Sequence, residues 1–207
     1  MRVATGSERR TDRADELRAS PARVRFLHVP ARRSVMIDGE GAPSPEAFAA
    51  RVPALYGAAY GLRFALKARG VDERVGPLEG LWWTTDDATD LPRTLAAERD
   101  TWHWTLMIAL PWAATDEEVG LQLAVARHRV DRGFATSLRV EDLDEGEVAQ
   151  LLHVGPYAHE RATIERLHAA IDAAGLRPTG RHHEIYLSDP RRSAPERLRT
   201  ILRRPVR

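Results

Sequence analysis

The sequence contains no cysteine among its 207 residues. Disulfides, thiolate nucleophiles and cysteine-based metal sites are therefore excluded, and the cytoplasm is the simplest compartment to expect. A charge excess is lacking too, because 31 Lys and Arg face 30 Asp and Glu, which gives a formal net charge of +1. This balance favours neither nucleic acid nor an anionic membrane surface as a partner.

Long apolar runs are also missing. No segment is apolar over the length that crosses a bilayer, so we expect no membrane association. Residues 1–23 are rich in Arg, Asp and Glu and lack the apolar core of a signal peptide, so they are predicted to form a polar N-terminal extension. Arginines gather again between residues 191 and 204, and we interpret that run as a solvated face and not as a nucleic-acid site.

The common catalytic and metal-binding motifs are absent as well. There is no Gly-rich phosphate loop, no nucleophile elbow and no dyad of Ser with His. His182 and His183 are adjacent, so a strand would point them to opposite faces, which is poor geometry for two ligands of one metal. We therefore expect neither a metal nor a cofactor.

Apolar residues make up 43% of the chain, which is enough to build a core. Hydrophobic periodicity predicts strands at 24–29, 34–38, 78–84 and 101–111, and helices at 45–69 and 115–131, the latter stopped by Gly133. A second round follows, with a hairpin of 137–143 and 147–154, a helix at 158–174 and strands at 182–187 and 198–202. The polar residues 85–100 are predicted to be a loop. This order predicts an α+β domain over residues 24–207, with two pseudo-repeats at about 24–132 and 133–207.

Two predicted strands each carry one glutamate among bulky neighbours, in the segments 76–83 (GPLEGLWW) and 181–190 (RHHEIYLSDP). Alternation along a strand places Glu79 on the same face as Trp83, and Glu184 on the same face as His182 and Tyr186. Lone carboxylates are rare on buried faces and aromatic rings are rare on exposed ones. The combination indicates an apolar ligand pocket with a reactive or cation-seeking group.

Aromatic residues surround the first of these glutamates. All five tryptophans fall between residues 82 and 112. Trp82 and Trp83 must point to opposite faces of their strand, so one of them should line a cavity or a partner surface. Trp104 and His103 occupy opposite faces of the next strand, and Tyr157 follows a rigid Gly-Pro turn. Such aromatic surface suits a planar aromatic or cationic small molecule.

Several motifs together resemble the GyrI-like small-molecule-binding family. They are VMIDGEG at 35–41, PLEGLWW at 77–83, WHWT at 102–105, LHVGPY at 152–157, RHHEIYLSDP at 181–190 and APERLRT at 194–200. The resemblance implies a duplicated strand–helix–strand–strand fold, with helices on one face of an antiparallel sheet and a pseudo-two-fold ligand groove between the halves. Relatives include ligand-sensing domains of multidrug-responsive regulators. Residues 1–23 show no helix-turn-helix pattern, so we do not expect a regulator.

The stand-alone branch with these motifs is similar to cyclopropanoid cyclopropyl hydrolases, which detoxify DNA-alkylating compounds bearing a cyclopropane fused to a dienone. The resemblance implies a hydrolase that opens this ring by water attack and confers self-protection or drug resistance. Glu184 is then expected to activate the water, and Glu79 to hold the water or orient the ligand. Tyr157, Tyr186 or His182 would donate to the developing phenolate. The roles of Glu79 and Glu184 could also be reversed.

The expected partner is a small hydrophobic or aromatic ligand. The residues expected to contact it are Trp82, Trp83, His103, Trp104, His182 and Tyr186. A non-catalytic protein that sequesters amphipathic or cationic molecules is the main alternative, and a protein-partner role, as in gyrase inhibition, is a third. We expect a monomer or weak dimer, because a duplicated half-domain already supplies the symmetry of a dimer.

Overall fold

The computed structural model describes residues 13–84, 99–129 and 137–207. Most of the loop expected at 85–100, the helix stop expected at Gly133 and the first half of the predicted N-terminal extension lie outside these residues. The remaining predicted elements can be compared with the structure one by one.

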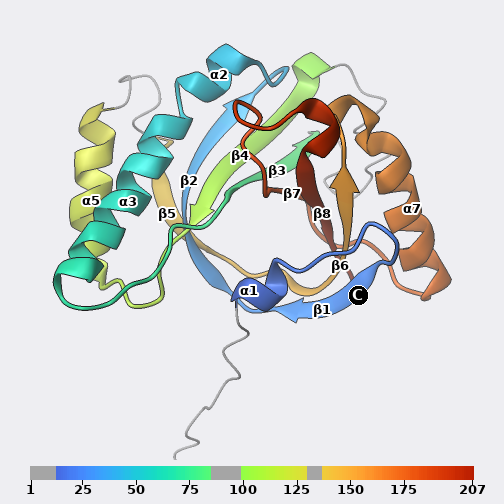
Figure 1. The fold of residues 1–207 in the computed structure, drawn as a ribbon, viewed down its shortest axis with the longest axis horizontal. Helices are drawn as coiled ribbons and strands as arrows, with labels where there is room; N and C mark the ends of the chain where they lie inside the picture. Colours follow the sequence, from blue (N-terminus) through green and yellow to red (C-terminus); the bar gives the residue numbers. More distant parts are fainter. Residues whose placement is uncertain (1–12, 85–98, 130–136) are drawn as a thin grey trace, which may run out of the picture.

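One antiparallel sheet of eight strands forms the body of the molecule, in the order β1-β6-β8-β7-β3-β4-β2-β5. The strands are β1 (Arg25–Val29), β2 (Arg32–Glu40), β3 (Leu78–Thr84), β4 (Trp102–Ala109), β5 (Arg139–Leu143), β6 (Gly146–Val154), β7 (His182–Tyr186) and β8 (Arg199–Pro205). Figure 1 shows that the sheet curls, with β3 and β7 near its middle. The predicted α+β class is confirmed.

Four helices of the described structure lie on one face of this sheet, which we call the helix face. They are α2 (Pro45–Ala49), α3 (Val52–Ala68), α5 (Asp116–Arg129) and α7 (Glu160–Ala173). Helix α3 contacts β2 and β4, α7 contacts β6 and β8, and α5 packs on α3. In Figure 1 the α3 and α5 pair flanks one side of the sheet and α7 the other, so the central strands lie between them.

Local sequence accounts for where the first helices begin and break. Ser44 caps α2, because its hydroxyl accepts the Ala47 N–H at 3.1 Å. The single helix predicted at 45–69 is instead two helices, since Pro53 in the first turn of α3 favours a new helix start over continuation. Buried side chains of α3 then pack on the sheet, as its helical spacing predicted.

The strand–helix–strand–strand unit occurs twice, as β2-α3-β3-β4 and as β6-α7-β7-β8. The hairpin predicted from 137–143 and 147–154 is wrong, because β5 pairs with β2 at one edge while β6 pairs with β1 and β8 in the other half. Each unit is thus completed by an edge strand that precedes the other unit in the chain. Strands β1 and β5 therefore each pair with a strand on the other side of the predicted boundary at residues 132–133. These pairings join the two halves into one sheet.

Register at the centre of the sheet decides which side chains can meet. Gly80 of β3 is the partner of Glu184 on β7, and Glu79 is the partner of Ile185. Because partners in register point to the same face, Glu184 and Gly80 lie on the helix face and Glu79 lies on the opposite face. The aromatic core under α3 occupies the helix face, around Trp82 and Trp104.

Residues 13–23 pack on the face opposite the helices. Residues Arg13–Glu16 form the short helix α1, drawn below the sheet in Figure 1. Glu16 is fully buried there, and the Ser20 carbonyl accepts the backbone N–H of Leu152 on β6 at 3.0 Å. Residues 13–23 therefore belong to the folded domain, which the predicted start at residue 24 left out.

Candidate functional site

Glu184 lies on the helix face of β7, between two side chains of its own strand. Tyr186 donates its hydroxyl to Glu184 Oε2 at 2.8 Å, and His182 Nε2 lies 3.3 Å from Glu184 Oε1. The Glu184 side chain is 14% exposed, so it is largely buried and still reachable from solvent. Within the described part of the chain, no arginine forms an ion pair with it. The structure thus brings together the three residues that alternation placed on one face.

The two neighbours of Glu184 are neutral at neutral pH. Burial lowers the pKa of His182, whose side chain is 3% exposed. Burial and the adjacent Glu184 raise the pKa of Tyr186 well above its ordinary value, so the hydroxyl keeps the proton that it donates. Glu184 therefore accepts a hydrogen bond from a hydroxyl and lies beside a neutral imidazole, and none of the described lysines and arginines forms an ion pair with it.

A second carboxyl group, Glu160, stands close to this site and was not identified from the sequence. Glu160 is the first residue of α7, is 6% exposed, and approaches Thr200 of β8. Its Oε1 is buried and has no hydrogen-bond partner in the described ranges. Burial and, after it, the charge of Glu184 raise the pKa of Glu160 to about 9. An acidic residue in the first helical turn usually interacts with the helix dipole, so the sequence alone gave no reason to single it out.

A rigid turn after β6 positions Tyr157. Gly155 has a φ of +134°, a conformation that side chains other than glycine rarely adopt. His153 braces the turn, since its Nδ1 lies 2.9 Å from Thr163 Oγ1 and its Nε2 lies 3.2 Å from the Pro156 carbonyl oxygen. Because a carbonyl only accepts, His153 Nε2 carries a proton and donates it to the Pro156 carbonyl. His153 is thus a positioning residue for Tyr157.

Tyr157 meets the cluster from outside the sheet. Its ring packs edge-on against Tyr186 with 5.9 Å between centroids, and 40% of the residue is exposed. Burial, followed by the charges of Glu160 and Glu184, raises the pKa of Tyr157 to about 12. Its hydroxyl is therefore a proton-bearing donor at the solvent side of the site. We call Glu184, Tyr186, His182, Glu160 and Tyr157 the Glu184 cluster.

Gly80 leaves the space that the cluster needs on β3. A Cβ at this position would lie 3.0 Å from Trp82 Nε1 and 3.1 Å from the Tyr186 hydroxyl oxygen. Trp82 Nε1 is buried without a hydrogen-bond partner in the part of the chain that the structure describes. An N–H donor and a hydroxyl therefore border the backbone beside Glu184, and one further polar group could satisfy the tryptophan.

The sequence analysis expected Trp104 to contact the ligand, but the structure places it in the core. Trp104 is fully buried and Trp82 is 6% exposed, and they lie 6.2 Å apart next to Phe48. Trp104 is a core residue, which corrects the expectation that it stacks on a ligand. Tyr56 of α3, which the sequence analysis did not select, is partly buried and packs against the same core as Tyr186.

Glu79 lies in a different environment, on the opposite face. It forms an ion pair with Arg13 of α1 and a 3.1 Å contact with His183 Nε2. His183 Nδ1 lies 2.9 Å from Glu145 Oε1, and Glu145 Oε2 accepts from Arg203 at 2.8 Å. The expectation that Glu79 shares a pocket with Glu184 is therefore wrong, because the two carboxylates are separated by the sheet.

This buried ionic network fixes the charge of each member. Burial disfavours the charged forms, but Glu145 and Glu79 outweigh it and raise the pKa of His183. Arg13 and His183 outweigh burial for Glu79 and lower its pKa, while His183 and Arg203 lower that of Glu145 to about 2. Arg203 is fully buried, as is Arg204 on the helix face, so the C-terminal arginines are not all solvated as the sequence indicated.

Trp83 and His103 also lie on the opposite face. They stack on each other with 5.9 Å between ring centroids, and the Arg181 guanidinium lies 3.6 Å from the Trp83 ring. Trp83 is thus already covered on its faces by a histidine and a cation. Neither side chain can contact a ligand bound at Glu184, which corrects that expectation for both.

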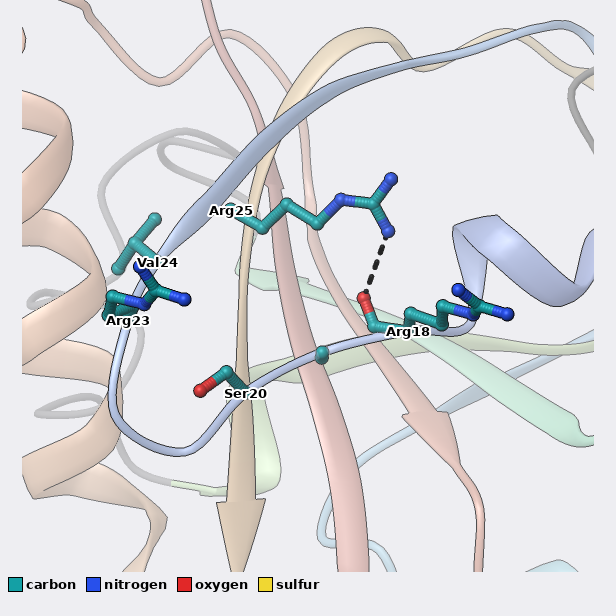
Figure 2. Close-up of a pocket in the computed structure, with 6 residues that line it drawn as sticks. Arg18, Ser20, Arg23, Val24 and Arg25 are labelled. Atoms are coloured by element: carbon teal, nitrogen blue, oxygen red, sulfur yellow. Dashed lines mark hydrogen bonds between the residues drawn. The ribbon is translucent and has the colours of Figure 1, made fainter.

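Two hollows of the described structure lie away from the Glu184 cluster. One lies where the chain turns before β1. Figure 2 shows Arg18, Arg23 and Arg25 around it, with Arg25 Nη1 donating to the Arg18 carbonyl at 3.3 Å. The other lies on the opposite face and is lined in part by Glu145 and Arg181.

Two further features bear on cofactors and membranes. Within residues 13–84, 99–129 and 137–207, no three His, Asp or Glu side chains are grouped as a metal site requires. Over the same ranges, none of the helices combines the length and the hydropathy of a bilayer span.

Comparison with known proteins places this geometry in a family. Residues 113–207 match the model of the GyrI-like small molecule binding domain. An uncharacterized conserved protein from Listeria innocua is 34% identical, with a TM-score of 0.79 over 94% of this chain and 96% of its own. A hydrolase from Listeria innocua is 32% identical, with a TM-score of 0.75 over the same shares. The C-terminal domain of EcmrR shares the fold at 10% identity, with a TM-score of 0.56 over 89% of this chain and 97% of that domain.

No curated protein matches the sequence. The matches that exist cover the repeated units described above and both motif strands, and they extend over nearly the full length of the two Listeria proteins. The chain belongs to the family of the GyrI-like small molecule binding domain.

Proposed function

We propose that this protein is a hydrolase that opens the cyclopropane ring of spirocyclopropyl-dienone alkylating agents, with Glu184 activating the attacking water. The observation that carries the proposal is the position of Glu184. It is largely buried, held by the Tyr186 hydroxyl and close to a neutral histidine, and its direct contacts include no arginine within the described chain. The similarity to a protein described as a hydrolase, at 32% identity, supports the same reaction class.

The chemistry needs a base for water and a donor for the oxygen that becomes negative. Water oxygen forms a bond to a ring CH₂ carbon while the strained C–C bond breaks, and the electron pair moves into the dienone to give a phenolate. Glu184 takes the water proton, as a general base within hydrogen-bond reach does. Tyr157 keeps its proton at neutral pH, because burial and the nearby carboxyl groups raise its pKa to about 12, so it can donate to the phenolate oxygen.

The neighbouring side chains fit a flat, largely apolar substrate. Tyr157 is exposed beside Tyr186, and Tyr56 of α3 packs on the same side of the sheet. Trp82 Nε1, which lies beside the Tyr186 hydroxyl next to Gly80, would donate to a polar group of the substrate. Detoxification of such alkylators, and the drug resistance that follows, is the biological role we propose.

A protein that sequesters cationic amphipathic molecules is the second candidate. Glu184 lies on the helix face beside the rings of Tyr186 and Tyr157, and a carboxylate next to aromatic rings attracts a cation. The description of the family as small-molecule-binding supports it equally. Product formation separates the two functions, since a sequestering protein returns its ligand unchanged.

The direct experiment incubates the purified protein with a spirocyclopropyl-dienone alkylator in H₂¹⁸O and follows the product by mass spectrometry. We expect catalytic formation of an ¹⁸O-labelled water adduct, and a loss of turnover of about 10²–10⁴-fold in Glu184→Gln. Tight binding with intact recovery of the compound would instead identify a sequestering protein. Full turnover by a folded Glu184→Gln variant would rule out the role of Glu184.

A further inference from the structure

Glu160 is a buried carboxyl group that the proposed reaction does not yet use. It is 6% exposed, and its Oε1 has no hydrogen-bond partner in the described ranges. Leaving a polar atom unpaired inside a protein is costly, so such an atom calls for an explanation. A glutamate held only for structure would normally meet an arginine or backbone N–H groups, as Glu79 and Glu145 meet their partners on the other face.

Its place in the fold directs Glu160 toward the site. The residue begins α7 directly after the turn that carries Tyr157. It approaches Thr200, whose register partner on β7 is Tyr186, and Thr200 Oγ1 is also buried and without a hydrogen bond in the described ranges. Glu160 and Glu184 are close enough for the charge of one to oppose ionisation of the other. Two carboxyl groups on one side of the sheet therefore have different surroundings, which is how acid and base roles are divided.

We propose that Glu160 is the general acid of ring opening and gives its proton to the dienone oxygen while Glu184 accepts the proton of water. This inference rests on the proposed function. Its geometric basis is the buried, unpaired carboxyl oxygen at the start of α7, set beside Thr200 and the Tyr157 turn.

The step balances without a further reactant. Before reaction Glu160 carries a proton and Glu184 does not. Water oxygen bonds to the CH₂ carbon, its proton passes to Glu184, the C–C bond breaks, and the carbonyl oxygen receives the Glu160 proton to become a phenol. Exchange of one proton with solvent at each carboxyl group then restores the starting state. Tyr157 would hold the substrate oxygen in place for this transfer.

The protonation of Glu160 depends on every charged or titratable group around it. Among the described residues, Glu184 and Tyr186 on β7 and Tyr157 before α7 interact electrostatically with Glu160, and beyond Glu184 lies His182, which Arg204 of β8 faces in turn. Burial and Glu184 dominate, and they raise the pKa of Glu160 to about 9. The acid therefore stays protonated in neutral solution and loses its proton as the pH rises through that value.

The test measures kcat and KM against pH for the wild type, Glu160→Gln and Glu165→Gln. Glu165 is the matched control, because it lies on the exposed side of α7 and pairs only with Arg161 in the described structure. We expect Glu160→Gln to lower kcat about 10²-fold with little change in KM, and to remove the alkaline limb of the pH profile. The loss should shrink for a substrate whose product phenol is more acidic, since a better-stabilised phenolate needs less help from an acid.

Each result decides the inference. Unchanged kcat and an unchanged alkaline limb in Glu160→Gln, beside an active wild type, would overturn the role of Glu160 and leave the proposed function standing. An inactive wild type would overturn the proposed function and this inference with it. If Glu160→Gln does not fold, Glu160→Asp should shift the alkaline limb, and an infrared carboxylic-acid band of the wild type should persist at neutral pH; absence of both effects would overturn the inference.

Discussion

Glu79 and Glu184 occupy neighbouring central strands and yet meet opposite surroundings. Glu79 faces a buried network in which Arg13 and His183 neutralise it. Glu184 faces a hydroxyl and a neutral imidazole, with a protonated carboxyl group nearby. The difference comes from register, because Gly80 and not Glu79 is the partner of Glu184. A carboxylate whose charge is already satisfied stabilises the fold, whereas one without a cation remains available for a ligand or a proton.

The largest expected effect on stability comes from breaking the network on the opposite face. Glu79→Ala should lower the free energy of unfolding by about 3–5 kcal/mol, because it breaks the buried contacts with Arg13 and His183 and leaves each of them with only its second carboxylate, Glu16 or Glu145. Urea unfolding followed by circular dichroism measures the loss. Glu147→Gln is the control, since its contact with His28 is exposed and should change stability by less than about 0.5 kcal/mol. Equal effects of the two substitutions would contradict the structural role of Glu79.

The two faces should also differ in how pH affects stability. Glu145 has a folded pKa of about 2, below its unfolded value. Its stabilising contribution to the free energy of unfolding is therefore fully present above pH 4.5 and is lost as the pH falls toward 2. Glu160 has a folded pKa of about 9, above its unfolded value. Its contribution to the free energy of unfolding is therefore fully present below pH 4.5 and is lost as the pH rises toward 9. The pKa of His183 is also raised, so its stabilising contribution to the free energy of unfolding begins to be lost above pH 6.5.

Unfolding free energies across pH therefore test the assignment of charges. Glu145→Gln should flatten the acid limb of the stability curve, and Glu160→Gln should flatten the limb between pH 4.5 and 9. If Glu160→Gln altered only the acid limb, Glu160 would be ionised in the folded protein and the contrast between the faces would disappear.

A smaller effect is expected at Gly80. Gly80→Ala would place a Cβ 3.0 Å from Trp82 Nε1 and 3.1 Å from the Tyr186 hydroxyl, so one of these groups must move away from Glu184. We expect a roughly tenfold loss of turnover and a stability loss of about 1 kcal/mol. Gly57→Ala is the matched control in α3, where nothing lies within 4 Å, and should stabilise the protein by up to about 1 kcal/mol. Loss of turnover in both variants would show that the effect at Gly80 is not local.

The sequence predicted the individual strands better than their partners. The strand at 78–84 and the strand beginning at His182 were found where the pattern placed them, because Pro77 and alternating bulky residues mark their limits. Alternation also identified which residues share a face within one strand. It could not give the register between β3 and β7, which depends on long-range pairing, and so it placed Glu79 and Glu184 in one pocket.

Other misses have the same origin in tertiary contacts. Arg203 was interpreted as solvated because arginine is usually exposed, but Glu145, Gln150 and the Glu16 carbonyl satisfy it in the interior. The strand β5 was predicted to form a hairpin with β6, but it pairs with β2 in the other half. The sequence could not identify Glu160 as a site residue, because its burial and its proximity to Glu184 depend on the tertiary structure. The fold class and family are confirmed, and the substrate remains a prediction.

The most direct measurement compares Glu184→Gln and Glu79→Gln side by side. Turnover of a spirocyclopropyl-dienone is normalised to folded protein, and the free energy of unfolding is measured on the same samples. We predict that Glu184→Gln loses turnover by about 10²–10⁴-fold and keeps its stability, while Glu79→Gln loses stability and keeps its turnover per folded molecule. Loss of turnover in a stable Glu79→Gln variant, with Glu184→Gln fully active, would contradict the assignment of the two carboxylates.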